Sequence, residues 1–229
     1  MSYEIVIPTS GRPSLAVVLE AVGPEGVIVV DDRRDRAVPL AVPDGVRVIA
    51  GPGAGPAAAR NAGWRCVRAE WVAFLDDDVL PPPGWRDALE RDLAAAGDAG
   101  ATQGRIVVPV PERPTDWERN VRGLEDARWA TADMAYRREA LAAVGGFDER
   151  FPRAYREDAD LGLRVVGAGW SIVRGERHIV HPVGPAPASI SLRKQAGNAD
   201  DVLMRRLHGP DWRERAGVPA GRRPRHLAV

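Results

Sequence analysis

Cysteine, lysine, aromatic side chains and long apolar runs are all scarce in this chain of 229 residues. The single cysteine, Cys66, excludes an internal disulfide and is typical of a reducing compartment, so we expect a cytoplasmic protein. Because Cys66 falls within a helix-like pattern, we expect a small buried side chain rather than a catalytic thiol. No apolar stretch is long enough to span a bilayer, and the chain begins directly with a strand-like segment, so we expect no signal peptide.

An excess of either charge is also lacking. The chain has 32 basic residues, nearly all of them arginine, and 32 acidic residues. This balance excludes the polybasic character of many proteins that bind nucleic acid or anionic membranes. We therefore expect no nucleic-acid partner.

Strand-like and helix-like segments alternate in the first half of the chain. Apolar runs predict strands at Tyr3–Ile7, Val27–Val30, Val46–Ile49 and Trp71–Leu75. Between and after them, the patterns predict helices from Pro13 to about Val22, from just after the Gly51–Pro56 break to about Arg68, and from Trp85 to Ala95. Repeated strand–helix–strand units of this kind indicate an α/β fold with a mostly parallel sheet flanked by helices.

The second half is less regular. We expect strands at Ala101–Val108, Met134–Tyr136, Ser171–Val173 and His178–Val180. We expect helices at Thr115–Ala127, Arg138–Val144 and Glu157–Val166, and a helical tail from about Ser189 to His208. The last dozen residues are rich in arginine and proline, which is typical of a mobile terminus.

Carboxylates follow two of the predicted strands directly. Asp31 and Asp32 end one, and Asp76, Asp77 and Asp78 end another. Three adjacent acids are costly to hold together unless a cation is nearby. Mg²⁺ and Mn²⁺ prefer such oxygen ligands, and Mg²⁺ usually binds through one or two carboxylates together with substrate phosphates. Because ligands of parallel sheets sit beyond the carboxyl ends of the strands, these acids predict a metal–diphosphate site.

Several segments in this order resemble the family 2 glycosyltransferases of the GT-A fold, over residues 5 to about 183. The resembling segments are Val6–Thr9, Val29–Asp32, Ala58–Gly63, Phe74–Asp78, Val144–Phe151 and Glu157–Arg164. The resemblance implies a single GT-A domain with a Rossmann-like central sheet. Residues 1–108 would form the nucleotide-sugar half, residues 109–187 the acceptor and catalytic half, and residues 188–229 a helical tail.

The resemblance also implies a donor site. The turn at Pro8 and Thr9 would meet the nucleobase, and Asp32 would accept a hydrogen bond from a base N–H. Arg60 would lie near the nucleotide, where its guanidinium could contact the diphosphate or the base. Asp133, in a loop under donor and acceptor, would touch the sugar hydroxyls.

In the same comparison, the metal ligands come from the acidic triplet. Asp78 would coordinate Mn²⁺ or Mg²⁺, while Asp76 would face the ribose or the water shell of the metal, and Asp77 belongs to the same donor-side group. A late histidine often adds a further ligand in this family. His181 is our choice for that ligand, with His178 as the alternative.

The implied reaction is an inverting sugar transfer. A sugar would move from a nucleoside-diphosphate sugar to a hydroxyl acceptor. UDP is the commonest nucleotide for such a site, with guanosine and thymidine sugars as alternatives. The pair Glu157 and Asp158 matches the family's base motif, and Asp158 is the residue that we expect to take the acceptor proton. The adjacent acids could raise the pKa of one of them towards neutrality.

Other functions stay open on the sequence. An Asp-X-Asp phosphatase places such a motif on an early strand and follows it with a small residue, whereas Val79 and Leu80 follow here. A nucleotidyltransferase needs a glycine-rich basic loop, for which residues 9–13 are a poor substitute. A catalytically inactive GT-A scaffold is the third alternative. The helix within Ser191–His208 could close over the acceptor, pack on the sheet or form a homodimer, and peripheral membrane association is compatible with the sequence.

Overall fold

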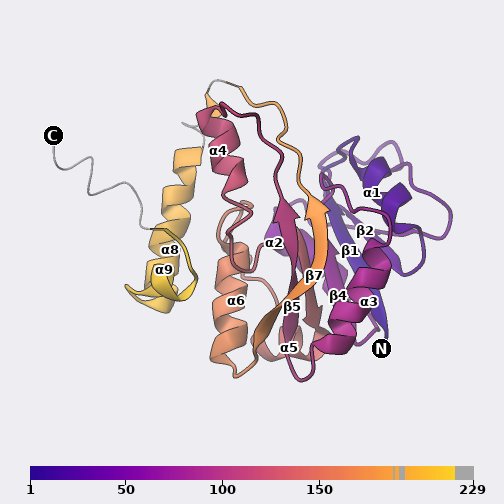
Figure 1. The fold of residues 1–229 in the computed structure, drawn as a ribbon. Coiled ribbons are helices and arrows are strands. Elements are labelled where there is room, and N and C mark those ends of the chain that lie inside the picture. Colours follow the sequence, from indigo (N-terminus) through magenta and orange to yellow (C-terminus); the bar gives the residue numbers. More distant parts are fainter. Residues whose placement is uncertain (188, 191–193, 220–229) are drawn as a thin grey trace.

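A seven-stranded sheet forms the centre of the molecule (Figure 1). The computed structural model describes residues 1–187, 189–190 and 194–219. The strands are β1 (Tyr3–Thr9), β2 (Val27–Asp31), β3 (Arg47–Ala50), β4 (Trp71–Leu75), β5 (Ala101–Val107), β6 (Asp133–Arg137) and β7 (Ile172–Val180). Their order across the sheet is β3-β2-β1-β4-β6-β5-β7. This mostly parallel sheet confirms the predicted fold class.

The directions of the strands decide where a site can form. β3, β2, β1 and β4 are mutually parallel, β6 is antiparallel to both β4 and β5, and β7 is parallel to β5. The carboxyl ends of β1, β2, β4 and β7 therefore share one edge of the sheet with the amino end of β6. The chain passes from β1 to β2 on one side and reaches β4 on the other, which is the switch point where ligands of such sheets bind.

Helices cover both faces of the sheet (Figure 1). On one face, α1 (Leu15–Val22) and α3 (Trp85–Ala95) pack against alternate strand residues such as Ile5 and Ile7. On the other face, α2 (Pro56–Trp64), α5 (Arg138–Val144) and α6 (Glu157–Gly167) pack against residues of opposite parity, such as Val6. This alternation arises because successive strand side chains point to opposite faces.

The C-terminal helices form an outer layer on α6 (Figure 1). α8 (Asn198–His208) and α9 (Trp212–Arg215) bury a third apolar cluster against α6 and the loop before it. Asp201 of α8 pairs with Arg156 just before α6, and His208 Nε2 lies 2.7 Å from Asp160 Oδ1 within α6. Among the described helices, none combines the length and the apolar character that crossing a bilayer requires.

Several boundaries differ from the prediction. α2 ends at Trp64 rather than near Arg68, so Cys66 lies in the following turn and is exposed, not buried. The polar helix predicted to reach Ala127 is only α4 (Asp116–Arg122), which begins with a capping box between Thr115 and Glu118. In the tail, a 3₁₀ turn at Gln195–Gly197 precedes α8, and α9 was not predicted. The predicted mobile terminus lies largely outside the described residues, as does part of the predicted tail helix.

The two short strands expected near the end of the sheet are one strand, β7. Its polar centre looked like a turn in the sequence. At that centre the register between β5 and β7 shifts, and the Asp92 carboxylate accepts hydrogen bonds from the backbone N–H groups of Glu176 and Arg177. A side chain from α3 thus provides the partners that a buried backbone needs.

Arg177 is fully buried beneath β6 and forms ion pairs with two carboxylates. Its Nη1 lies 2.9 Å from Asp92 Oδ2, and its Nε lies 2.7 Å from Asp133 Oδ1. The Trp85 indole N–H also donates to Asp133 Oδ2. Burial raises the pKa of Asp133, and Arg177 counteracts that rise. The expectation that Asp133 touches sugar hydroxyls is therefore corrected: both of its oxygens are engaged inside the protein.

We expect Arg177→Met to destabilise the protein by about 3–5 kcal/mol, because it leaves two buried carboxylates without their cation. The measurement is the free energy of unfolding by urea denaturation. Arg174→Met is the matched control, since Arg174 is an exposed residue of the same strand, and it should change stability by less than about 0.5 kcal/mol. Equal effects of the two substitutions would show that the buried ion pairs do not stabilise this part of the sheet.

Candidate functional site

The acidic triplet after β4 meets the loop that follows β1. Asp77 is buried, and its Oδ2 accepts a 2.5 Å hydrogen bond from the Thr9 hydroxyl. Arg12 Nη1 lies 3.1 Å from Asp77 Oδ1 and also pairs with Asp78. Burial raises the pKa of Asp77, and the two neighbouring aspartates raise it further against the opposing effect of Thr9 and Arg12. Thr9 therefore braces the triplet through its hydroxyl, and the contact of the Pro8–Thr9 turn with a nucleobase stays a prediction.

Asp78 and His181 come from different strand ends and lie close together. His181 Nε2 is 3.8 Å from Asp78 Oδ1, and the Asp78 side chain is one-third exposed. A carboxylate and an imidazole that face the same edge fit a divalent cation that takes its other ligands from water and phosphate. No cluster of three such side chains suited to a metal occurs in the described ranges. His178 is exposed within β7, two residues before its end.

Asp32 shapes the opening beside the triplet. Its carboxylate accepts hydrogen bonds from the backbone N–H groups of Gly53 at 2.6 Å and Gly55 at 3.3 Å. A cavity of about 810 Å³ lies here, lined by Ser10, Asp32, Arg33, Arg34, Asp35, Gly53, Ala54, Gly55 and Pro152. Asp32 is half-buried at this cavity, so its hydrogen bond to a base N–H stays a prediction. Pro8 lies within β1, opposite Val30 of β2.

Arg60 lies beneath the site rather than in it. Its side chain is 4% exposed, and its two terminal nitrogens reach Asp76 Oδ1 at 2.7 Å and Glu157 Oε1 at 2.9 Å. Burial opposes the charge of Arg60, but the two carboxylates outweigh it and raise its pKa. The expectation that Arg60 contacts the nucleotide is therefore corrected. Arg60 instead joins the end of β4 to the beginning of α6.

Glu157 is fixed by the same interaction. It is buried, its Oε1 accepts from Arg60, and its Oε2 accepts from the backbone N–H of Tyr155 at 2.7 Å. Both oxygens are engaged, so the structure corrects the expectation that Glu157 takes part directly in catalysis. Through these contacts Glu157 fixes the start of α6, and it places a negative charge next to Asp158.

Asp158 has the environment expected of a general base. It lies in the first turn of α6, half-buried, and its Oδ1 accepts a 2.7 Å hydrogen bond from the Ala159 N–H. Burial and the adjacent charge of Glu157 raise the pKa of Asp158 from 3.8 to about 7. A carboxylate with a pKa near neutrality can both accept and release a proton at physiological pH.

Trp129 packs against the helix that carries Asp158. Its backbone has φ of 64°, which is rare for a bulky residue, and its N–H donates to Gln103 Oε1 at 2.7 Å. A Cβ on Gly162 of α6 would come within 2.2 Å of the Trp129 ring, so only glycine permits this approach. Because Asp158 and Gly162 are four residues apart, the ring lies against the face of α6 that bears Asp158.

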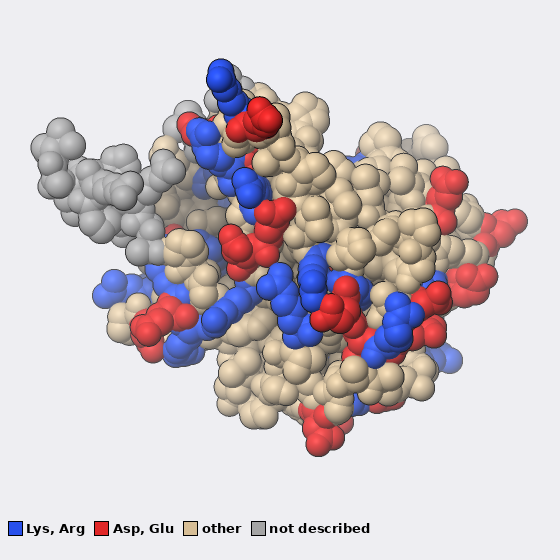
Figure 2. Space-filling model, viewed as in Figure 1, with Lys and Arg blue, Asp and Glu red and all other residues tan. Residues whose placement is uncertain are grey.

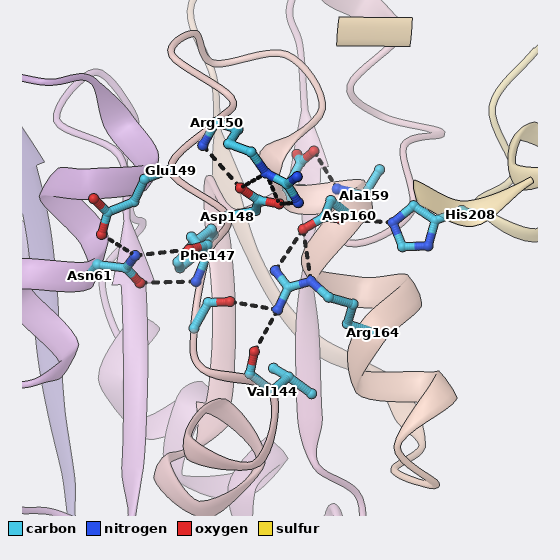
Figure 3. Close-up of polar contacts among 12 residues, drawn as sticks. Asn61, Val144, Phe147, Asp148, Glu149, Arg150, Ala159, Asp160, Arg164 and His208 are labelled. Atoms are coloured by element: carbon cyan, nitrogen blue, oxygen red, sulfur yellow. Dashed lines mark hydrogen bonds and ion pairs between the residues drawn. The ribbon is translucent and has the colours of Figure 1, made fainter. Parts of the chain in front are cut away.

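Asn61 joins α2 to the loop between α5 and α6 (Figure 3). Its Nδ2 donates to the Phe147 carbonyl and to Glu149, and its Oδ1 accepts from the Phe147 N–H. In the same view, Asp160 pairs with both Arg164 and His208. These contacts fix the loop to α2 and to α6, and α6 to α8.

Two features of the site were not predicted from the sequence. Arg12 was noted only as part of a poor nucleotide-binding loop, although a basic residue just beyond a strand end is a signal for a phosphate contact. The hydrogen bonds between Asp32 and the glycine-rich turn need a contact across about twenty residues of chain that no local pattern reveals. Acidic and basic side chains are interspersed over the face seen in Figure 2, in line with the balanced composition.

Solved structures with the same fold include glycosyltransferases. Glucosyl-3-phosphoglycerate synthase from Mycobacterium tuberculosis, in complex with Mn²⁺, UDP and phosphoglyceric acid, superimposes with a TM-score of 0.60 at 17% identity, covering 96% of this chain and 80% of that one. A mannosyltransferase from Pyrobaculum calidifontis, with GDP-mannose and Mn²⁺, gives a TM-score of 0.59 at 19% identity, covering 88% and 64%. The fold is thus of the GT-A class.

Sequence comparison gives the family. The model described as glycosyl transferase family 2 matches residues 5–161, and this chain therefore belongs to that family. A pre-mycofactocin glycosyltransferase of Mycobacterium tuberculosis is 30% identical over 129 residues, which is 50% of this chain and 27% of that protein. The succinoglycan biosynthesis protein ExoO of Rhizobium meliloti is 36% identical over 105 residues, 42% of this chain and 30% of that protein. The chain matches less than a third of the length of these curated relatives.

The pKa of Asp158 predicts how stability depends on pH. In the folded protein this carboxyl holds its proton up to about pH 7, whereas in the unfolded chain it loses the proton near pH 3.8. Its contribution to stability therefore falls as pH rises between those two values. We expect Asp158→Asn to stabilise the protein at pH 8, on the order of 1–3 kcal/mol, and to have little effect at pH 4.

Urea denaturation at several pH values tests this prediction. Asp87→Asn is the control, because Asp87 is an exposed acid in the first turn of another helix, α3, and should show no such pH dependence. If Asp158→Asn were instead less stable than the parent at pH 8, the carboxylate would be stabilised in place, and the raised pKa would be wrong.

Proposed function

We propose that this protein is a metal-dependent inverting glycosyltransferase that moves a sugar from a nucleoside-diphosphate sugar to a hydroxyl acceptor. The observation that carries the proposal is that one buried arginine, Arg60, connects two groups of acidic side chains. Asp78 and His181 lie on the donor side, Asp158 lies on the acceptor side, and Arg60 connects the two through Asp76 and Glu157. Family membership supports the same reaction class.

The donor side is suited to a nucleoside diphosphate. Asp78 and His181 would hold Mn²⁺ or Mg²⁺, which neutralises charge on the leaving diphosphate when bound. Asp32 and the cavity beside it would take the base and ribose. The one-third exposure of Asp78 and the remaining oxygen of Asp76 leave room for phosphate and water ligands. Similar folds have been crystallised with Mn²⁺ and UDP or GDP-mannose, and we extend that class of donor to this chain.

The acceptor side is suited to proton removal. As the acceptor oxygen bonds to the anomeric carbon and the bond to the diphosphate breaks, Asp158 would take the hydroxyl proton. Its pKa of about 7 leaves a substantial fraction ionised at neutral pH while keeping the carboxylate a competent base. Attack on the face opposite the diphosphate inverts the anomeric centre. Trp129, next to the same face of α6, would form a wall for the acceptor.

The alternatives receive less support from the geometry. A phosphatase of the Asp-X-Asp type uses the first aspartate as a free nucleophile, whereas Asp76 is paired with the buried Arg60. An inactive scaffold has no need for a carboxylate held near neutrality beside a divalent-ion site. We therefore keep the scaffold and the phosphatase as outcomes of the experiments below.

We expect Asp158→Asn to lose at least about 10²-fold in turnover, because general-base help is typically worth ~10²–10⁴-fold. Nucleotide affinity should change by less than about threefold, since Asp158 lies on the acceptor side. The measurement is hydrolysis or transfer of UDP-glucose and GDP-mannose with Mn²⁺, together with calorimetric binding of UDP and GDP. For the parent protein, kcat/KM should rise with pH up to about 7.

Asp87→Asn serves again as the control and should keep the parent's turnover. Near-normal turnover of Asp158→Asn would reject the base assignment. Equal loss of turnover and nucleotide binding would point to a structural role instead.

We expect the melting temperature to rise by several degrees when Mn²⁺ and the matching nucleotide are added together at about 100 times Kd, because that occupancy adds about 2.7 kcal/mol. Asp78→Asn should lose most of this shift, whereas Asp98→Asn, an exposed acid beyond α3, should keep it. Thermal denaturation with UDP, GDP and the corresponding nucleotide sugars, each with and without Mn²⁺, would measure this rise. Cleavage of phosphomonoesters instead of sugar nucleotides would favour the phosphatase, and cleavage of neither would favour the scaffold.

A further inference from the structure

Arg12 reaches the acidic triplet from the loop after β1. Gly11 has φ of 88°, and its N–H donates to the Thr9 hydroxyl at 2.9 Å, which turns the chain back across the strand ends. The Arg12 guanidinium then contacts Asp77 at 3.1 Å and pairs with Asp78. Its side chain is 52% exposed, so it can leave these carboxylates without disturbing the core.

Asp78 therefore lies between two basic side chains. Arg12 pairs with Oδ2, and His181 Nε2 lies 3.8 Å from Oδ1. A divalent ion bound to Asp78 and His181 would stand next to the positive guanidinium and share its carboxylate. Like charges at such short range repel, by an amount that solvent reduces for exposed groups. Arg12 and the metal thus compete for one carboxylate.

A bound diphosphate would replace the repulsion between Arg12 and the metal by an attraction of both to the phosphate. Its oxygens carry negative charge and accept paired hydrogen bonds from a guanidinium. Arg12 can then transfer from Asp78 to a phosphate, which frees the carboxylate for the metal. Two other arginines near the site are already engaged: Arg60 is buried between Asp76 and Glu157, and Arg33 makes two hydrogen bonds to the Asp31 carboxylate through its side chain.

We propose that Arg12 is a diphosphate-binding residue that competes with the divalent cation for Asp78, so that metal and nucleoside diphosphate bind cooperatively. This inference rests on the proposed function, because it needs a metal at Asp78. Removal of Arg12 has opposite effects on the two binding states. Metal alone should bind more tightly, whereas metal with nucleotide should lose affinity. Because coupling between two ligands is reciprocal, nucleotide affinity should lose its metal dependence to the same extent.

The test measures Mn²⁺ binding by electron paramagnetic resonance, with and without saturating UDP or GDP. For Arg12→Gln we expect the Kd for Mn²⁺ alone to fall by about two- to fivefold, and the Kd with nucleotide to rise by a similar factor, as for one exposed charge contact. Arg12→Lys keeps the charge but loses the paired hydrogen-bond geometry. Its Kd values for Mn²⁺ should lie between those of the parent and those of Arg12→Gln. Arg91→Gln removes an exposed charge from α3 and should match the parent in both states.

Each result has a distinct meaning. Opposite shifts in the two states support the proposal. Shifts in the same direction, or no shift, overturn it while leaving the metal site intact. If the parent protein bound no Mn²⁺ with either nucleotide, the metal-dependent function and this inference would both fail. Melting temperatures of all variants without ligand establish that each one is folded.

Discussion

A single buried cation holds the two halves of the candidate site together. Arg60 comes from α2, yet its guanidinium lies between Asp76 at the end of β4 and Glu157 at the start of α6. A charge at 4% exposure is tolerated only because both carboxylates compensate for its lost hydration. The distance between the donor-side acids and Asp158 is consequently set by one rigid side chain. Removal of either partner would leave an unpaired charge in the interior, so the three residues are expected to depend on one another.

The carboxylates of the site differ in chemistry because their surroundings differ. Asp77 is braced by Thr9 and Arg12, Glu157 is neutralised by Arg60, and Asp78 remains partly exposed beside His181. Asp158 has no ion-pair partner among the described residues, and burial together with the charge of Glu157 next to it raises its pKa to about 7. Acids that are neighbours in the sequence thus differ in burial, in partners and in pKa, and the proposed function gives them structural, metal-binding and proton-accepting roles. This is the usual way in which a fold assigns acid and base roles at neutral pH.

Local patterns predicted the fold better than they predicted the partners of individual side chains. Apolar runs such as Val27–Val30 identified buried parallel strands, and Trp85–Ala95 and Arg138–Val144 matched the observed helices. Polar segments misled the prediction of strands where a side chain distant in sequence supplies hydrogen bonds to the backbone. The centre of β7 is polar, yet it remains a strand because Asp92 of α3 bonds its backbone. Asp133 and Arg60 were assigned to the ligand because the family resemblance implies that they lie near the site, but it does not tell whether their charges face solvent or another side chain.

The C-terminal helices also help to fix the position of α6. Asp201 of α8 pairs with Arg156, immediately before Glu157 and Asp158, while His208 contacts Asp160 one turn further along α6. The third apolar cluster covers the outer side of α6 between these two contacts. α6 is therefore held on one side by the sheet and Arg60, and on the other by α8. The proposed base role of Asp158 requires such fixation from both sides, because the carboxylate must keep its position while the acceptor hydroxyl approaches from solvent.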